Sequence, residues 1–279
     1  MVNRRYFSIR TGKNEGVIEY DLDLLRRLFY STYVSFNNKE YFQEAFGKDC
    51  VDVGLIPGTA GIDIELFFFK KLRKPGLWPI YDNYENYAED DLFDVIELLY
   101  DLISKPVDGT YHSWSNCGWH YATFDKSSGK LEFRKDINEF LKDYQDGWEL
   151  SESGEILSIG EEGLNNLFKA KLPESREDIS NKIKYAVLKF RRHKSSIEDR
   201  KEAVRELADV LEYLRPQVKQ ELLSKDESDL FNIANNFGIR HYNQRQKEDY
   251  NKSVWLSWIF YIYLSTIHLI IRIIDTDKI

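Results

Sequence analysis

The stretch from residue 235 to 246, NNFGIRHYNQRQ, concentrates side chains that could bind a phosphate and move a proton. Guanidinium and amide groups hold phosphate oxygens through hydrogen bonds, and an imidazole titrates near neutral pH. RNA cleavage can use the 2′-hydroxyl of the RNA itself, so a protein needs only a proton-transfer group and a cation near the phosphorus. The candidate residues are His241 for proton transfer, Arg240 and Arg245 for phosphate, and Asn236 for orienting the loop or the substrate.

Any contact with RNA must be local, because the chain carries a formal net charge of −8 and loose binding to polyanions draws on many basic contacts. Basic residues are nevertheless concentrated in the segment 182–205, which contains nine basic and three acidic residues. A solvated helix face is the default explanation of such a segment. The alternative is that basic side chains of this segment bind successive phosphates of an RNA backbone, and we call this candidate surface the basic track. Its candidate residues are Lys189, Arg191, Arg192 and Lys194.

A second group of chemically capable residues lies in YHSWSNCGWHYATFD, at positions 111–125. His112, Cys117, His120 and Asp125 are enough donors for a tetrahedral zinc site. No paired CxxC or HExxH accompanies them, and a strand of period two would direct neighbouring donors to opposite faces. We therefore expect an aromatic β-region with no metal and no cofactor. A nucleophilic Cys117 is also disfavoured, because nothing in the sequence lowers the pKa of its thiol.

The absence of several well-known sequence motifs reduces the number of functional classes to consider. The chain has no Walker loop, no GxGxxG and no GxSxG, which leaves phosphotransfer, Rossmann binding and nucleophile-elbow hydrolysis without support. Its two cysteines are too few for a disulfide framework, and the opening MVNRRYFSIRTGK is not followed by an apolar run. Both observations predict a reduced, cytoplasmic setting.

Hydrophobic periodicity predicts a first half that mixes helices and strands. Helical spacing covers residues 21–46, 61–73 and 89–104. Between 107 and 158 the pattern changes to short strands, at 110–114, 119–124 and on both sides of the turn SESG, with a helix at about 132–144. The segment KLPES at 171–175 is a plausible boundary, because every later element is helical.

From residue 176 onward the sequence predicts helices alone. Apolar stripes run from Ile179 to Phe190, from Ile197 to Leu214 and from Leu230 to Phe237, and Gly238 stands where a helix-ending left-handed residue is expected. The last segment, 247–275, is long and apolar enough to suggest a membrane span. It contains polar residues and has no basic flank, so we expect a buried bundle helix and no membrane.

The end of the chain resembles the HEPN superfamily, in particular the C-terminal domains of bacterial abortive-infection proteins. The matching residues are Asn236, Phe237, Gly238 and His241, preceded by DESDLFNIA and followed by DYNKSVWLSWIFYIYL. The resemblance covers about residues 176–279. It implies an α+β, mostly α protein, with a small N-terminal α+β domain at 1–172 and a HEPN-like helical bundle at 173–279.

Active members of this family are metal-independent endoribonucleases that pair two copies, each supplying an Arg and a His separated by four to six residues. With His241 as the histidine, the Arg would fall at 234–236, where the chain has Ala234, Asn235 and Asn236. Counting forward from Arg240, the His would fall at 245–247, and none of those residues is His. Arg240 or Arg245 would have to present the guanidinium from the loop.

Two functions therefore follow from the resemblance. The first is an RNA-directed protein of phage defence, a candidate endoribonuclease that uses His241 with Arg240 and Arg245. The second is a catalytically silent dimerisation and binding module, with RNA or a regulatory protein as its partner. Both imply a homodimer formed through the C-terminal helices.

Overall fold

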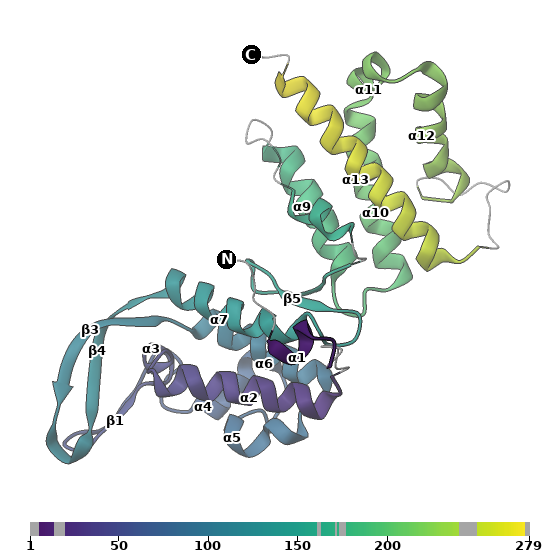
Figure 1. Ribbon diagram of the computed structural model, residues 1–279. Coiled ribbons are helices and arrows are strands. Elements are labelled where there is room, and N and C mark those ends of the chain that lie inside the picture. Colours follow the sequence, from purple (N-terminus) through teal and green to yellow (C-terminus); the bar gives the residue numbers. More distant parts are fainter. Residues whose placement is uncertain are drawn as a thin grey trace. The chain divides into compact units, whose positions relative to one another are not determined.

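The computed structural model describes residues 6–13, 20–160, 163–170, 172, 177–239 and 250–276. The chain divides into two compact units, Met1–Ile156 and Leu157–Ile279. This division lies earlier in the chain than the boundary expected at 172. As the composition and periodicity predict, the protein is α+β and mostly α, with a few small two-stranded sheets (Figure 1).

Helices and hairpins alternate in the first unit. In chain order its elements are α1 (Phe7–Arg10), α2 (Leu22–Asn38), α3 (Gln43–Phe46), β1 (Lys48–Cys50), β2 (Gly54–Ile56), α4 (Ile64–Leu72), α5 (Ile80–Asn83), the 3-10 helix η1 (Tyr84–Asn86), α6 (Glu89–Leu102), β3 (Lys105–His112), the 3-10 helix η2 (Trp114–Asn116), β4 (Gly118–Asp125), α7 (Lys126–Leu141) and β5 (Trp148–Leu150). Ile156, the last residue of the unit, begins the strand β6 (Ile156–Ser158).

Aromatic rings fill the core of the first unit, as the composition predicts. Helix α7 packs against α2 and α6, and at their contact Phe36 and Phe133 meet edge to face with centroids 5.4 Å apart. Large buried rings remove much apolar area from water, which stabilises this small α+β body. The helix expected at 89–104 is confirmed as α6, with Glu89, Asp90 and Asp91 in its first turn, where the helix dipole favours acids.

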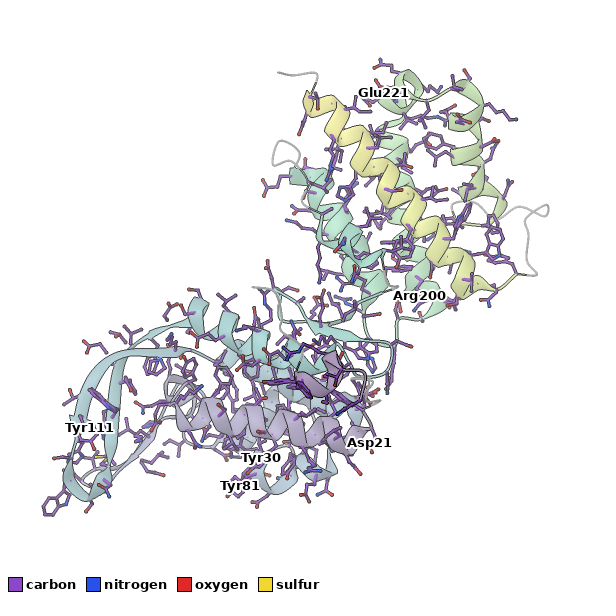
Figure 2. The ribbon with its side chains drawn as sticks, in the orientation of Figure 1. Asp21, Tyr30, Tyr81, Tyr111, Arg200 and Glu221 are labelled. Atoms are coloured by element: carbon purple, nitrogen blue, oxygen red, sulfur yellow. The ribbon has the colours of Figure 1, made fainter. Side chains whose placement is uncertain are left out.

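Two antiparallel hairpins extend from this helical core. The strands β3 and β4 form a long hairpin, and β1 and β2 form a short one beside it (Figure 1). Figure 2 shows Tyr111 on the long hairpin, where its side chain is exposed. The strand expected at 119–124 is confirmed as β4, and the one expected at 110–114 forms part of β3 but ends at His112, where a 3-10 helix follows. The β1–β2 hairpin was not predicted from the sequence. Cys50, His112, Cys117 and His120 lie on these two hairpins.

Helices alone make up the described part of the second unit after β6. They are α8 (Asn165–Lys169), α9 (Glu177–Arg191), α10 (Ile197–Tyr213), α11 (Arg215–Glu221), α12 (Ser224–Asn236) and α13 (Lys252–Thr276). Helix α10 lies between α9 and α13 and packs against both. The stripe from Ile179 to Phe190 is buried, and Gly238 has the left-handed φ of 65° expected after α12.

Helix α13 is apolar enough, over 25 residues, to cross a membrane by length and composition. Within the second unit, 56% of its apolar window is buried. Leu256, Ile259, Phe260, Tyr263 and Leu264 pack into the same core as α9 and α10. The burial is compatible with a soluble protein and with the buried bundle helix expected from the sequence.

Candidate metal centre

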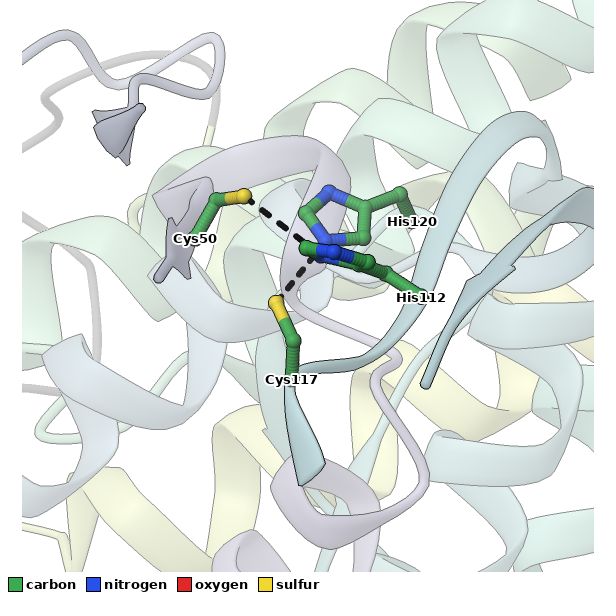
Figure 3. A group of neighbouring side chains, drawn as sticks. All are labelled: Cys50, His112, Cys117 and His120. Atoms are coloured by element: carbon green, nitrogen blue, oxygen red, sulfur yellow. Dashed lines mark hydrogen bonds between the residues drawn. The ribbon is translucent and has the colours of Figure 1, made fainter. Parts of the chain in front are cut away.

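Four side chains from the two hairpins converge on one point of the first unit (Figure 3). Cys50 is the last residue of β1, His112 is the last residue of β3, Cys117 lies in the turn after η2, and His120 lies in β4. Their donor atoms all lie within 4.8 Å of one another. We call these four residues the thiol–imidazole cluster.

The long hairpin brings its two histidines onto one face. In the register of β3 and β4, Thr110 pairs with His120 and His112 pairs with Gly118. His112 and Thr110 are two residues apart and therefore point to the same side of the strand. His112 is thus the diagonal neighbour of His120, and the two imidazole centroids lie 5.8 Å apart.

The turn between the strands brings Cys117 to the same side. Ser115, Asn116 and Gly118 all have left-handed φ values, of 47°, 56° and 92°. At Gly118 the absence of a Cβ makes this conformation inexpensive. Cys117 precedes β4, so the period-two alternation that argued against a metal site does not apply to it. This turn corrects our expectation that Cys117 and His120 would point to opposite faces.

The separations of the donor atoms suit a tetrahedral zinc ion. The distance from Cys50 Sγ to His112 Nδ1 is 3.8 Å, and that from Cys117 Sγ to His120 Nε2 is 3.1 Å. Bonds of about 2.3 Å to sulfur and about 2.0 Å to nitrogen place tetrahedral sulfur and nitrogen ligands roughly 3.5 Å apart. The two measured distances lie on either side of this value. Small shifts of these side chains, apart for one pair and together for the other, would therefore bring the donors to bonding distance.

Asp52 supports one ligand from outside the cluster. Its Oδ2 lies 3.2 Å from Nε2 of His112, while Nδ1 of the same ring faces Cys50. A proton on Nε2 shared with the carboxylate leaves the Nδ1 lone pair directed at the centre. Metal-binding histidines commonly make this second contact to a carboxylate. The geometry of Asp52 is thus a separate indication that the cluster suits a metal.

The surroundings of Cys50 favour the thiolate form of its side chain. Hydrogen bonds from the backbone N–H groups of Asp52 and Val53 lower the pKa of its thiol, and the Cys117 side chain adds to the effect. The thiolate is the form of cysteine that binds a metal. The β1–β2 turn therefore supplies both a ligand and the backbone donors that favour its charged state.

Gln43 fixes the strand that carries His120. Its side-chain oxygen accepts a hydrogen bond of 2.6 Å from the backbone N–H of Tyr121, and its amide donates one of 3.0 Å to the carbonyl of Trp119. The two partners are the residues on either side of His120. Gln43 is itself buried in α3. Its two bonds therefore join the helical core to the backbone on both sides of a candidate ligand.

The cluster opens onto solvent through a hollow of about 310 Å³ lined by both hairpins. Cys50, Asp52, His112 and His120 belong to its walls. Cys50 is partly exposed there, whereas Cys117 is only 9% exposed. A small solute can thus reach one thiol of the pair more easily than the other.

The fourth ligand candidate of the sequence analysis does not join the cluster. Asp125 is the N-cap residue of α7, where it accepts hydrogen bonds from the Ser127 and Ser128 hydroxyls and from the Ser128 backbone. The bonds from Ser128, and then Ser127, lower the pKa of Asp125 well below its usual range. Cys50, which was not among the ligands expected from the sequence, takes its place. The one available signal was that Cys50 is the only other cysteine of the chain.

Most of the predicted catalytic loop cannot be compared with the structure. Arg240, His241 and Arg245 lie outside the described residues. Asn236 is the last residue of α12 and is exposed. The proton-transfer and phosphate-binding roles assigned to this loop therefore stay predictions.

The four residues of the basic track have different surroundings. Lys189 forms ion pairs with Glu202 and Asp199, and the bond to Glu202 is the main reason that its pKa is raised. Arg191 is 6% exposed, donates from Nε to the carbonyl of Ser158 at 2.8 Å and lies over the Phe168 ring. Arg192 and Lys194 are exposed. Lys189 and Arg191 thus make contacts within the second unit.

Comparison with protein-family models, with curated proteins and with solved structures finds no match for this chain. The function is therefore argued from the geometry of the cluster and from the chemistry of its residues.

Proposed function

We propose that the first unit binds a zinc ion at the thiol–imidazole cluster and that this ion is structural. The observation that carries the proposal is the convergence of two thiols and two imidazoles within 4.8 Å. Thiolate and imidazole ligands in a tetrahedral set favour zinc over magnesium or calcium, which prefer oxygen.

A structural role follows from the number of ligands. Catalytic zinc sites use three protein ligands and keep a fourth position for water or substrate, whereas structural sites use four. Here the ion would join the end of β1 to the turn of the β3–β4 hairpin. Two-stranded hairpins are marginally stable by themselves in water. Zinc would therefore supply the stability that these small sheets lack.

A nucleophilic pair of Cys117 and His120 is the competing explanation, since their side chains lie 3.1 Å apart. It leaves Cys50, His112 and the contact to Asp52 without a role. Cys117 is also nearly buried, while a nucleophile has to reach a substrate. The zinc proposal accounts for all five residues.

Metal analysis of the full chain tests the proposal. The purified protein, loaded with zinc and passed through a desalting column, should retain one zinc ion per chain by elemental mass spectrometry. Cobalt in place of zinc should give the visible absorption of a tetrahedral site with thiolate ligands. Cys50→Ser, Cys117→Ser, His112→Gln and His120→Gln should each weaken retention strongly, because each removes a ligand.

The matched control is Asp49→Asn, which removes a carboxylate next to Cys50 from an exposed side chain outside the cluster. This variant should retain zinc like the wild type. Absence of zinc from the wild type, with the protein folded by circular dichroism, would refute the metal centre. Equal retention by the ligand variants and Asp49→Asn would refute it as well.

For the second unit we propose an RNA-directed role in phage defence, in a cytoplasmic setting. The HEPN resemblance supports it, together with the all-helical character of α8 to α13 and the end of α12 at Asn236, next to the predicted loop. His241 would transfer the proton, and Arg240 and Arg245 would hold phosphate. The second form of this proposal is a silent module that binds RNA or a regulatory protein.

Sequencing of cellular RNA ends separates these two forms. Wild type and an Arg240→Ala, His241→Ala double variant are expressed in bacteria. Cleavage ends that vanish in the variant would support an endoribonuclease, because the variant lacks the proton-transfer group. Identical profiles in both strains would exclude cleavage through these residues and favour the silent module.

The proposed homodimer has a candidate surface on α13. Val254, Trp258 and Leu269 are exposed at positions that recur along one side of this helix. A second copy could cover them through the same surface, as two-fold dimers do. Analytical ultracentrifugation of wild type and of a Trp258→Ala, Leu269→Ser variant should show a dimer for the first and a monomer for the second. A monomeric wild type would contradict this proposal.

A further inference from the structure

We infer that the thiol–imidazole cluster is also an oxidation switch, in which a hydroperoxide joins Cys50 to Cys117 in a disulfide and releases the zinc ion. This inference rests on the proposed zinc site and adds a regulation of it. Its basis is that both cysteines of the 279-residue chain lie at this one point.

The two thiols are close but belong to separate segments. Their sulfur atoms lie within the 4.8 Å that encloses all four donors, and 66 residues separate the two in sequence, since Cys50 ends β1 and Cys117 follows η2. Neither cysteine is in a disulfide in the structure. A bond between them therefore requires a local approach of the two turns and no rearrangement of the helical core.

Unequal exposure assigns a different role to each thiol. Cys50 lines the hollow of about 310 Å³ at the surface of the cluster. Cys117 is 9% exposed and is not among the residues of that hollow. A small oxidant meets Cys50 first, and Cys117 is the neighbour that can resolve the product. Oxidation-sensitive cysteines commonly combine an accessible thiol with such a resolving partner.

The reaction balances with hydrogen peroxide as the oxidant. The Cys50 thiolate attacks one peroxide oxygen, the O–O bond breaks, hydroxide leaves, and Cys50 becomes a sulfenic acid. The Cys117 thiolate then attacks the Cys50 sulfur, forms the disulfide and displaces a second hydroxide. Two electrons pass from the two sulfurs to peroxide, and two protons from solvent convert the hydroxides to water. Zinc loses both anionic ligands, so it is released.

The disulfide would preserve the connection that the ion made. It joins the end of β1 to the turn before β4, as zinc does through the same two residues. We therefore expect release of zinc without unfolding of the first unit. His112 and His120 would lose the ion they share, and reduction of the disulfide would restore the four ligands.

The test uses the zinc-loaded full chain. Zinc release is followed with a colorimetric chelator in buffer and in ~1 mM hydrogen peroxide, where it should become at least about tenfold faster. Peptide mapping without reduction should show the Cys50–Cys117 disulfide in an amount that matches the released zinc. Dithiothreitol with added zinc should restore the ion, and circular dichroism should stay unchanged throughout.

Single-cysteine variants test the assigned order. In Cys117→Ser, peroxide with dimedone should label Cys50 as a sulfenic acid, because no resolving thiol is present. In Cys50→Ser, the buried Cys117 should be labelled far less. Equal labelling of the two thiols would overturn the assignment of Cys50 as the first to react.

The outcomes separate failure of the two proposals. A folded wild type that binds no zinc refutes the metal centre itself. A zinc-loaded wild type that keeps its ion in peroxide refutes the switch and leaves the metal centre standing. Release accompanied by sulfinic acid, or by a disulfide between two chains, also refutes the switch.

Discussion

At the scale of single residues, Asp52 tests whether the cluster binds a metal through an oriented imidazole. Its carboxylate contacts Nε2 of His112 at 3.2 Å, whereas Asp49 makes no such contact and belongs to the same hairpin. Loss of a carboxylate behind a ligating histidine weakens metal binding by about 10- to 100-fold. Asp52→Asn should show that loss in competition with a chelator of known affinity. If Asp49→Asn weakens zinc binding equally, the effect comes from the loss of a negative charge near the site and not from the contact with His112.

Glu97 in α6 makes the stability of the first unit depend on pH. Burial raises the pKa of its carboxyl group from 4.5 to about 7, although its Oε1 accepts a 2.6 Å hydrogen bond from the backbone N–H of Ile156. The folded state therefore holds this proton more tightly than the unfolded state. The contribution to stability is complete below pH 4.5 and is lost as the pH rises through about 7.

Glu97→Gln isolates this contribution, because glutamine keeps an acceptor for Ile156 and cannot ionise. Relative to the wild type, the variant should gain about 1–2 kcal/mol in free energy of unfolding between pH 5 and pH 8, a range already reduced for partial exposure. Urea unfolding at the two pH values measures the difference. A difference that does not change with pH would show that Glu97 has an ordinary pKa in the folded protein.

At the scale of elements, α13 shows how an apolar helix can serve a bundle core. Phe260 is fully buried and stacks on Phe190 of α9 with centroids 4.0 Å apart. Trp258, two positions earlier, is 43% exposed. Phe260→Ala should lower the free energy of unfolding of the second unit by about 3–5 kcal/mol. Trp258→Ala should lower the free energy of unfolding of the monomer by less than about 1 kcal/mol, and chemical denaturation of both variants at a protein concentration too low for dimers compares them.

At the scale of the whole molecule, two separate cores predict two unfolding transitions. One core contains the aromatic residues of α2, α6 and α7, and the other is built around α10 and α13. A ligand that binds only the folded state raises the melting temperature of the unit that binds it. Removing zinc with a chelator should therefore lower the midpoint temperature of one calorimetric transition and leave that of the other unchanged.

The Phe260→Ala variant identifies the second transition, because it weakens only the helical core. The midpoint temperature of the second unit's transition should fall in this variant, while that of the chelator-sensitive transition stays the same. The Cys50→Ser variant should lose the sensitivity to the chelator. A single transition that moves in every case would show that the two units unfold together.

Much of the fold could be predicted from the sequence, because periodicity is a local property. The repeat of Leu92, Val95, Ile96 and Leu99 indicated α6, and the stripes after residue 176 indicated α9, α10 and α12, all of which the structure contains. The apolar character of residues 254–274 also predicted a buried helix. In each case the same short segment both carries the pattern and forms the element.

The sequence by itself determined the long helices and the long hairpin, and it showed which cysteines and histidines the chain contains, but it indicated an extended segment where α1 forms. Only the tertiary structure decided that Cys50 meets His112, Cys117 and His120, and that Asp125 caps a helix instead. Local periodicity does not record which turns approach each other, since that depends on how α3 and its Gln43 hold β4 and on where β1 ends beside the long hairpin. The left-handed turn at 115–118 then directs Cys117 toward His120, a conformation that the strand pattern alone does not indicate.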